Sequence, residues 1–416
     1  MEEIVTVNPA TARELERFAY STPEQVTQAL DQARAAFTDW KDAGFSARGD
    51  VLSRAASLLR ERSQSLAEIA VREMGKPIVQ AKAEVEKCAT ACDYFAKNGE
   101  GFMGDERIES NATRSYVAFR PLGAVLAIMP WNFPYWQVFR AAAPALMAGN
   151  VMLLKHASNT TRCALEIERV FRDAGAPEGV FTTLLLTGER AGELLADNRI
   201  AAVTLTGSEG AGIAVAAAAG KALKRCVLEL GGSDPYIVLG DADMDAAVAT
   251  AVTARFQNNG QSCIAAKRFI IEDRIYEKFV SHFAQAASKQ LIGDPMDERT
   301  QLGPLARADL RDDLHALITQ SVVDGARIVT GGDPIGREGF FFAASVIADV
   351  VPGMPMFDRE TFGPAAAVIR ARDDDHAVEL ANQSAFGLGA NLWTRDLEHA
   401  QRLASQIESG MVYING

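Results

Sequence analysis

The chain has 416 residues, and its 42 basic and 54 acidic residues give a formal net charge of −12. This balance argues against nucleic acid or an anionic membrane surface as the main partner. The length exceeds what one ordinary core can hold, so we expect two or three domains.

The start of the chain and its cysteines indicate a cytoplasmic protein. The sequence MEEIVTVNPA lacks the basic and apolar regions of a signal peptide. No stretch approaches the roughly 20 apolar residues of a membrane span. Without an export signal, the five cysteines are expected to be reduced thiols. The five histidines form no short-spaced cluster with cysteine, so we expect no metal site.

The first hundred residues are predicted to be helical. Thr22 is placed to cap a helix that has Pro23 at its first position. Apolar residues recur at three- and four-residue spacing over 46–75 and 80–97, which also indicates helices.

Beyond residue 115 the pattern changes to strands that alternate with helices, which is typical of a doubly wound α/β domain. The strand-like segments are 115–123, 123–130, 150–155, 181–186, 201–207 and 225–230. A second alternating series follows: a strand at 235–239, a helix at 243–257, a strand at 267–272, a helix at 275–290, a strand at 326–332, and the segments 376–383 and 391–396. We therefore expect a boundary between two α/β domains at about residue 230.

The segment TLTGSEGAG (204–212) is a candidate phosphate site. A strand ends at Thr206-Gly207-Ser208 and opens an alanine-rich helix over 209–220. A helix N-terminus after a small-residue turn suits an anion. The spacing from Gly207 to Gly212 is not that of G-x-G-x-x-G, and a strand–glycine–helix junction often serves packing alone. Both interpretations stay open at this point.

Lys155 stands at the carboxyl end of a predicted strand, where open α/β sheets bind ligands. A solvated lysine after a strand is an equally good interpretation. Ser158, three residues on, is predicted to cap the next helix.

The segment MPWNFPYWQVFR (129–140) forms a turn constrained by two prolines directly after an apolar strand. Asn132 could donate its amide to an oxyanion, or it could satisfy turn backbone. Arg140, on the following helix, could face the same pocket or only solvent.

Two glutamates, one phenylalanine and one cysteine complete the candidates. Glu229 in VLELGGSDP is expected in the middle of an apolar strand, so it is either buried with a raised pKa or at the mouth of a site. Glu360 and Phe362 precede a Gly-Pro break and a strand. Cys263 in NNGQSCIAAKR is either a small buried hydrophobe or a nucleophile.

The sequence resembles the aldehyde dehydrogenase superfamily over essentially the whole chain. The motifs that carry this resemblance are, in order, PWNFP, TGS at the start of a helix, LELGG, NGQSC and ETFGP. Within it, LAIMPWNFPYWQVFR, LLKHAS, CVLELGGSDPYIVL and CIAAKRFIIE are most similar to bacterial succinate-semialdehyde dehydrogenases.

The resemblance implies two doubly wound, Rossmann-like α/β domains with a small β-hairpin for oligomerisation. It assigns residues 1–103 and 121–229 to an NAD(P)-binding domain, 104–120 to the hairpin and 230–416 to a catalytic domain. Such enzymes are homodimers or homotetramers.

The resemblance also implies catalytic roles. Cys263 would attack the aldehyde carbon as a thiolate. The amide of Asn132 and the backbone N–H of Cys263 would hold the oxyanion. After hydride passes to the nicotinamide, Glu229 would activate the water that hydrolyses the thioester. Relatives that transfer the acyl group to coenzyme A usually lack this glutamate, so its presence favours hydrolysis.

For the cofactor, the resemblance places Lys155 and Ser158 at the adenosine ribose, Ser208 at the pyrophosphate and Glu360 at the nicotinamide ribose. Serine at 158 stands where NAD enzymes often carry glutamate. It removes a charge that would repel the 2′-phosphate, so NADP is expected to be accepted, and NAD as well. The remaining cofactor positions implied are Trp131, Thr206, Gly207, Gly212, Leu230 and Phe362.

For the substrate, Arg140 matches an arginine that grips the carboxylate of succinate semialdehyde. Gln257 departs from the pattern, because many of those enzymes have a second arginine there. Trp136 and Tyr135 suggest an aromatic channel that would also admit apolar or aromatic aldehydes. Succinate semialdehyde is the expected substrate, and another small aliphatic or aromatic aldehyde is the alternative.

A different class of function is a dinucleotide-binding protein with impaired catalysis. The sequence ends at MVYING, whereas the family normally continues for a few dozen residues through a pocket segment and a subunit-joining strand. If these are absent from the protein, activity is expected to fall, and restoring them is expected to raise it.

Overall fold

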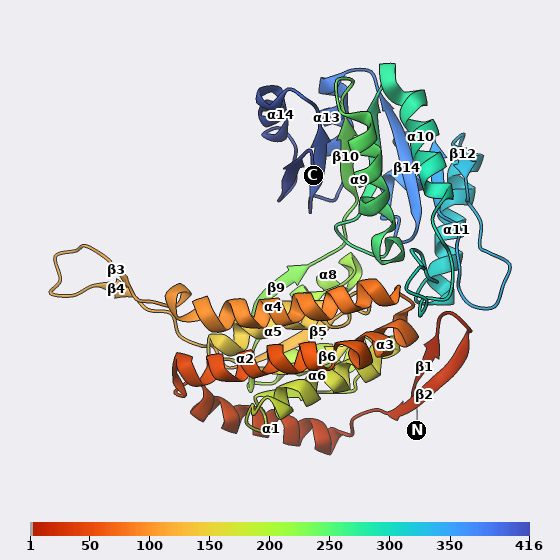
Figure 1. The fold of residues 1–416 in the computed structure, drawn as a ribbon. Helices are drawn as coiled ribbons and strands as arrows, with labels where there is room; N and C mark the ends of the chain where they lie inside the picture. The colour runs from red at the N-terminus through yellow and green to blue at the C-terminus, as the bar shows by residue number, and fades with distance from the viewer. Residues whose placement is uncertain (1–2) are drawn as a thin grey trace. The chain divides into compact units, whose positions relative to one another are not determined.

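The computed structural model describes residues 3–416, and the chain forms two compact units, each built on its own sheet (Figure 1). The first unit contains the residues up to Val7 together with Glu14–Glu73 and Ala81–Leu230. The second contains Asn8–Arg13, Met74–Gln80 and Gly231–Gly416. The cofactor and catalytic roles assigned to the two halves of the chain stay predictions.

The main sheet of the first unit is parallel throughout, in the order β7-β6-β5-β8-β9. The chain builds outward from β5 to β7 and then returns to the other side of β5 for β8 and β9. The point where this direction reverses is where doubly wound sheets bind ligands. The strands are β5 (Ala124–Met129), β6 (Val151–His156), β7 (Phe181–Thr183), β8 (Ile200–Thr206) and β9 (Arg225–Glu229).

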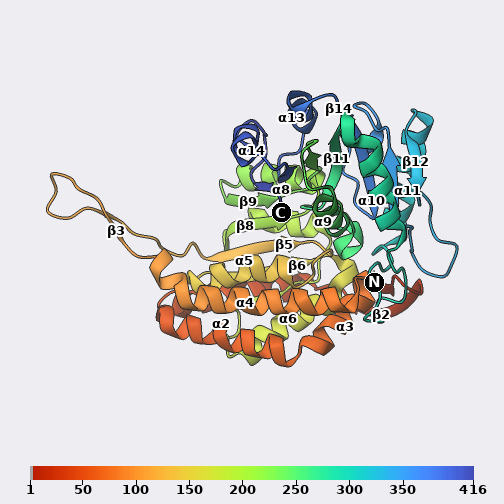
Figure 2. The same ribbon diagram turned by 45° about the horizontal axis from the view of Figure 1, so that its top comes forward.

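Helices cover this sheet, and the long helix α4 runs alongside α2 (Figures 1 and 2). Thr22 caps α1 as predicted, because its hydroxyl accepts the Gln25 N–H at 3.2 Å. The helices are α1 (Pro23–Trp40), α2 (Gly44–Glu61), α3 (Ser63–Met74), α4 (Ile78–Phe102), α5 (Trp136–Met147), α6 (Thr161–Asp173), α7 (Gly188–Glu193) and α8 (Glu209–Lys221), with 3-10 turns at Ser158–Thr160 and Leu194–Ala196.

The prediction that the first hundred residues are helical is wrong at their start. Strands β1 (Glu3–Asn8) and β2 (Arg13–Ala19) pair as a two-stranded sheet. Ile4 and Thr6 are buried while Val5 between them is exposed, which is the two-residue period of a strand rather than the period of a helix.

The strand predicted over 115–123 is much shorter, because only Tyr116–Val117 (β4) pairs, with Glu106–Arg107 (β3). This hairpin stands away from the rest of its unit (Figure 1). Its side chains Ile108, Tyr116 and Val117 are exposed. Apolar side chains on a projecting hairpin suit contact with another chain, and the oligomerisation role stays a prediction.

The sheet of the second unit has the order β12-β13-β14-β11-β10-β15-β16, in which β12 pairs antiparallel and the other neighbours pair parallel. The strands are β10 (Asp234–Val238), β11 (Ala266–Glu272), β12 (Arg327–Thr330), β13 (Ser345–Ala348), β14 (Ala365–Ala371), β15 (Ala390–Trp393) and β16 (Val412–Ile414). The helices are α9 (Met244–Phe256), α10 (Tyr276–Ser288), α11 (Ala308–Val323), α12 (Pro355–Asp358), α13 (Asp374–Asn382) and α14 (Leu397–Ala404), with 3-10 turns at Gln257–Gly260 and Asp273–Ile275.

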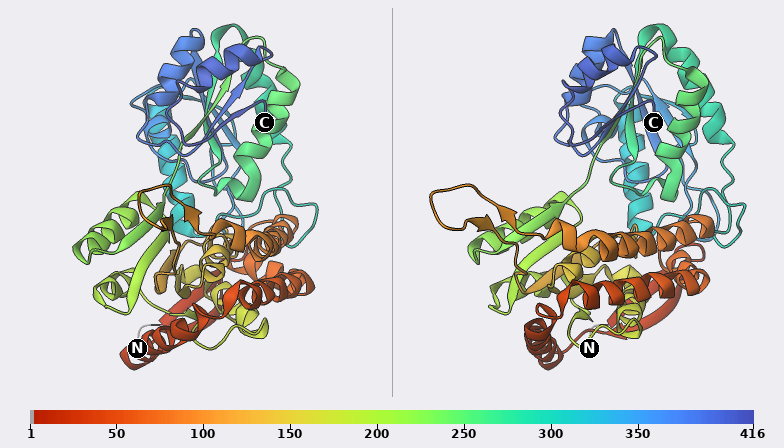
Figure 3. Two further views of the ribbon diagram at one scale, coloured as in Figure 1. Left: turned by 90° about the vertical axis from the view of Figure 1, so that its left-hand side faces the viewer. Right: turned by 60° about the vertical axis from the view of Figure 1, so that its left-hand side comes forward.

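Both faces of this sheet are buried, which explains the continuous apolar runs of its strands. Along β10, Ile237 belongs to the apolar cluster under α11–α14, whereas Tyr236 and Val238 belong to the cluster under α9 and α10. Figure 3 shows the two helix groups on opposite faces of the sheet. The prediction of an α/β fold with two doubly wound sheets is confirmed. Over residues 3–416, no helix has the length and apolarity that crossing a membrane requires.

Candidate functional site

In the first unit, the predicted residues follow the carboxyl ends of adjacent strands. The parallel register aligns Ile128 with Lys155 and Thr206 with Glu229. Because the carboxyl ends of parallel strands lie at one edge of a sheet, the turn after β5, the segment after β6 and the turn after β8 gather there. This edge holds the switch point of the fold.

The turn that carries Asn132 is anchored by a carboxylate from another helix. Glu84 on α4 accepts the backbone N–H of Tyr135 at 2.8 Å and that of Trp136 at 2.9 Å. These amides belong to the start of α5, where a negative charge is stabilised by the unpaired N–H groups. Asn132 is 4% exposed. Glu84 thereby fixes the backbone that follows Asn132, as is required if the Asn132 amide is a preorganised hydrogen-bond donor.

His156 ties the same turn to the end of β6. Its Nδ1 accepts the Ala157 N–H at 2.8 Å, so the neutral ring carries its proton on Nε2. That Nε2 donates to the Pro134 carbonyl at 2.9 Å. Burial lowers the pKa of His156 to about 4, so the ring stays neutral near pH 7. The Asn132 turn and the Lys155 segment therefore share one buried hydrogen-bonded link.

This buried histidine predicts an acid-sensitive fold. Its pKa is lower in the folded chain than the usual 6.5, so its stabilising contribution is present above pH 6.5 and is lost as pH falls through about 4. The loss amounts to about 3 kcal/mol at most. His156→Gln is expected to abolish this part of the pH dependence in urea unfolding measured between about pH 7 and pH 4.5. His282→Gln on α10 is the control, and an unchanged pH dependence in His156→Gln would contradict the assignment.

Arg140 lies within reach of two other predicted residues. Its guanidinium donates to the Thr206 hydroxyl at 3.0 Å and pairs with the Glu229 carboxylate at 3.4 Å. Their side chains are 35% and 41% exposed, so the ion pair is screened and worth less than about 1 kcal/mol. A ligand carboxylate can therefore compete for Arg140 at little cost.

The expectation that Glu229 stands in the middle of an apolar strand is wrong. Glu229 is the last residue of β9, which lies at the end of the sheet order, and the first three residues of this strand are exposed. The sequence pattern misleads here because a short apolar run does not distinguish an edge strand from a central one. Of the two interpretations of Glu229, its partial exposure fits the mouth of a site rather than a buried carboxyl.

Residues at the predicted cofactor positions suit a dinucleotide in chemical terms. Ser208 caps α8, its hydroxyl accepting the Ala211 N–H at 3.4 Å, and the remaining N–H groups of this helix end suit phosphate. Lys155 is half-buried, and burial lowers its pKa. A Cβ on Gly212 would meet the Leu230 side chain at 2.6 Å, so the glycine lets α8 pack against the segment after β9.

The prediction that Ser158 caps the next helix, α6, is wrong. Ser158 begins a 3-10 turn and is exposed, and α6 starts three residues later. The amides of Arg162 and Cys163 instead donate to Glu73 of α3 at 2.9 and 3.0 Å. The Ser158 hydroxyl is thus not used as the helix cap.

The aromatic residues of the turn are less open than expected. Tyr135 is fully buried, and its hydroxyl donates to the Leu66 carbonyl at 2.9 Å, so it lines no channel. Trp136 is half-buried, with the Lys87 ammonium 4.1 Å from its ring centroid. Trp136 stays a predicted substrate contact.

In the second unit, an unusual loop precedes Cys263. Asn258, Asn259 and Gly260 all have positive φ, at 55°, 58° and 71°. Asn and Gly are the residues that tolerate this left-handed backbone. The Asn259 side chain donates to the carbonyls of Gly75 and Pro304 and accepts the Gly303 N–H, at 2.7–2.9 Å. The loop is therefore held rigidly. Cys263, which follows it, is half-buried and is not part of a disulfide.

The other candidates of this unit differ in their surroundings. Glu360 accepts the Gly232 N–H at 3.1 Å and pairs with Lys267 at 3.3 Å. Lys267 also donates to the Cys263 carbonyl at 2.8 Å, so the structure brings Glu360 and the Cys263 loop to one lysine. Phe362 is half-buried, and Gln257, at the end of α9, is exposed.

Three residues of the site were not found from the sequence: Glu84, His156 and Lys267. Glu84 and His156 act through backbone groups distant in the chain, which leave no local pattern. Lys267 had a signal in the sequence, because Lys267 and Arg268 stand side by side in a predicted parallel strand, where a buried charge needs a partner. In the structure all seven residues of β11 are buried.

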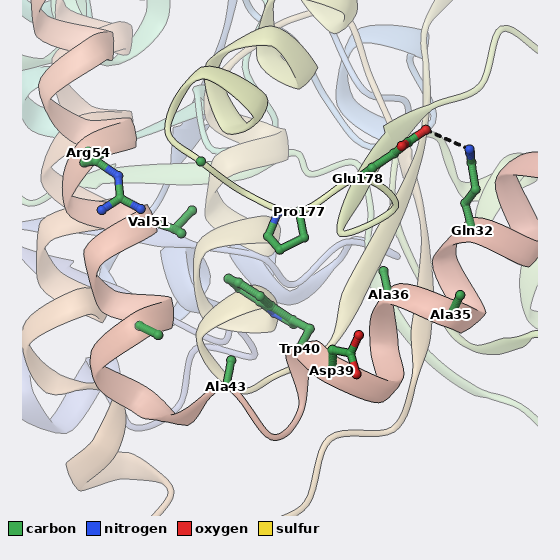
Figure 4. Close-up of a pocket in the computed structure, with 12 residues that line it drawn as sticks. Gln32, Ala35, Ala36, Asp39, Trp40, Ala43, Val51, Arg54, Pro177 and Glu178 are labelled. Carbon is green, nitrogen blue, oxygen red and sulfur yellow. Dashed lines mark hydrogen bonds between the residues drawn. The ribbon is translucent and has the colours of Figure 1, made fainter.

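A separate cavity of about 550 Å³ lies in the first unit between α1, α2 and the loop before β7. Trp40, Val51 and Pro177 line it, and Gln32 donates to Glu178 at 2.8 Å beside it (Figure 4). None of the predicted site residues lines this cavity, so it is distinct from the strand-end site. Among residues 3–416, no group of three His, Cys, Asp or Glu side chains is arranged to hold a metal.

Comparison with known proteins gives a consistent result. The model of the aldehyde dehydrogenase family matches residues 1–416. The chain is 47% identical to the succinate semialdehyde dehydrogenase [NAD(P)+] Sad of Escherichia coli (strain K12), over 99% of this chain and 89% of that protein. It is 47% identical to a probable succinate-semialdehyde dehydrogenase [NADP(+)] of Synechocystis sp., over 99% and 91%. Among solved structures, succinic semialdehyde dehydrogenase from Streptococcus pyogenes in complex with NADP+ is similar, with a TM-score of 0.97, 35% identity and coverage of 99% and 91%.

Proposed function

The chain belongs to the aldehyde dehydrogenase family, and from this premise we propose that it oxidises succinate semialdehyde to succinate with NADP or NAD as the cofactor. The observation that supports this substrate is the position of Arg140. Its guanidinium contacts Glu229 and Thr206 at the carboxyl end of the sheet. A guanidinium at a reactive centre suits an aldehyde that bears a carboxylate.

Family membership confirms the resemblance that the sequence motifs carried. The cofactor assignment is supported by the relatives, which are named for NAD(P)+ or NADP+, and by the NADP+ complex of the Streptococcus pyogenes enzyme. It also agrees with a capped helix start at Ser208 and a half-buried Lys155 at one sheet edge. Serine at 158 supports acceptance of the 2′-phosphate of NADP, because it adds no opposing charge.

We assign the first chemical steps to the Cys263 loop and the Asn132 turn. The Cys263 thiolate attacks the aldehyde carbon, and the carbonyl π electrons move to oxygen. The Asn132 amide, fixed through Glu84 and His156, and the backbone N–H of Cys263 donate to that oxyanion. The bound cofactor supplies the acceptor for the hydride that leaves this carbon.

Release of the acid is assigned to Glu229. Its carboxylate takes a proton from water, which attacks the thioester carbon, and the thiolate of Cys263 leaves. When the substrate carboxylate engages Arg140, the guanidinium is drawn from Glu229 and the base is free to bind water. Lys155 and Ser158 are assigned to the adenosine ribose, Ser208 to the pyrophosphate and Glu360 to the nicotinamide ribose.

The initial rate of nicotinamide reduction tests this function. With succinate semialdehyde and no coenzyme A, we expect turnover with NADP and with NAD, measured in parallel at matched concentrations. Propanal is the neutral comparison and is expected to have a lower kcat/KM, because it offers no carboxylate to Arg140. An equal kcat/KM for the two aldehydes would contradict the substrate assignment, and a requirement for coenzyme A would contradict hydrolysis by Glu229.

A further inference from the structure

Lys267 is a buried basic residue that contacts the backbone at Cys263. It lies in β11, its side chain is 0% exposed, and its ammonium donates to the carbonyls of Ser262 at 2.9 Å and Cys263 at 2.8 Å. The same ammonium lies 3.3 Å from the Glu360 carboxylate. One amine therefore contacts the backbone of the predicted nucleophile and the carboxylate predicted to bind the cofactor ribose.

Glu360 is held from a second side. The carboxylate oxygen that faces Lys267 also accepts the Gly232 N–H at 3.1 Å. A Cβ on Gly231 would lie 2.4 Å from the other carboxylate oxygen, and a Cβ on Gly232 would lie 2.7 Å from the Cys263 carbonyl. The glycine pair thus lets the backbone approach both groups, and Glu360, with a side chain 23% exposed, keeps access to solvent.

Other charges near Lys267 already have partners. Arg255 donates to the carbonyls of Ala266, Gly260 and Gly363, and Arg268 to those of Ser233, Leu380 and Ala381. The carboxylates that face Lys267 are Glu360 and Asp234, and Asp234 is itself buried. Burial lowers the pKa of Lys267, while Glu360 is the largest influence that opposes this change. These two carboxylates thus oppose the effect of burial and favour the ammonium form of Lys267.

We propose that Lys267 is a positioning residue that holds the Cys263 loop and Glu360 in one frame and makes the Cys263 thiol easier to deprotonate. The inference rests on the proposed role of Cys263 as nucleophile. A cation beside a cysteine stabilises the thiolate, which is the reactive form. The bonds to two consecutive carbonyls fix the backbone that carries the thiol. A lysine that only filled the core would stabilise the fold without changing the thiol.

The test is a titration of the thiol in two variants. Lys267→Gln keeps a hydrogen-bond donor but no charge, and Lys267→Met removes both. Iodoacetamide alkylation of Cys263 is followed by mass spectrometry of its peptide over a range of pH, without aldehyde or cofactor. Both variants are expected to react about tenfold more slowly near pH 7, with the midpoint of the pH profile displaced upward by about one unit. Thermal melting identifies which variants are folded. If Lys267→Met does not fold, the titration of Lys267→Gln alone tests the inference.

Lys76→Met is the matched control, because Lys76 is a fully buried lysine of the same unit. It is expected to leave the thiol midpoint where it is in the unchanged protein. A midpoint unmoved in folded Lys267→Gln overturns the inference. The titration needs no turnover, so this result is distinguishable from failure of the proposed function, which is a wild-type chain that does not oxidise the aldehyde.

Discussion

Cys263→Ala is expected to reduce the rate of nicotinamide reduction with succinate semialdehyde by at least about 10³-fold, because alanine has no nucleophile for the aldehyde carbon. The rigid loop of Asn258, Asn259 and Gly260 is built independently of the thiol, so the variant is expected to fold. The measurement is the steady-state rate with saturating cofactor, accompanied by a thermal melt.

The control for this variant is Cys226→Ala, which removes the exposed cysteine of β9. It is expected to keep the wild-type rate within about twofold, since surface substitutions away from special features change little. A Cys263→Ala variant that keeps a substantial part of its rate would contradict the nucleophile assignment, and it would do so whichever aldehyde is used.

Arg140→Ala is expected to raise KM for succinate semialdehyde by about 10- to 100-fold, the equivalent of the roughly 1.5–3 kcal/mol of a charge-assisted hydrogen bond. KM for propanal is expected to change little, because this aldehyde has no carboxylate. Loss of Arg140 also removes the partner of Glu229, so kcat with propanal is not expected to fall. Both parameters are measured for both aldehydes.

Two further variants sharpen this comparison. Arg140→Lys keeps the charge but not the planar fork, and it is expected to give an intermediate KM. Arg169→Ala on α6, with a side chain 56% exposed, controls for loss of a surface arginine. Equal increases of KM for the charged and the neutral aldehyde would remove the carboxylate-binding role and leave Arg140 as a residue that orders Thr206 and Glu229.

The sequence predicted the elements whose signals are local. Short, largely apolar runs predicted β5, β6, β8, β10 and β11 close to their observed bounds. Asn-Asn-Gly before Cys263 is likewise a local signal, because these residues favour the left-handed backbone observed there. Residues that directly follow such strands lie at the same edge of the sheet, because the carboxyl ends of parallel strands meet there.

The contacts that prepare the site were not predictable, because they join residues far apart in the chain. Glu84 binds amides 51 and 52 positions away, and neither helix carries a pattern that reports this. The surroundings of Glu229 depend on strand order, and a short apolar run reads the same at the edge of a sheet as in its centre. The burial of Tyr135 depends on α3, which supplies the acceptor for its hydroxyl.

The edge position of β9 has a consequence for motion. Within the described residues this strand has a neighbouring strand on one side only, β8, so it can fray without breaking the rest of the sheet. The Gly207 amide donates to the Glu229 carbonyl at 3.0 Å and is the last tie of this ladder, directly beside the turn that suits a pyrophosphate. Binding of the proposed cofactor at that turn would therefore slow the local opening of β9. The backbone of Glu229 would then become more ordered when the cofactor binds.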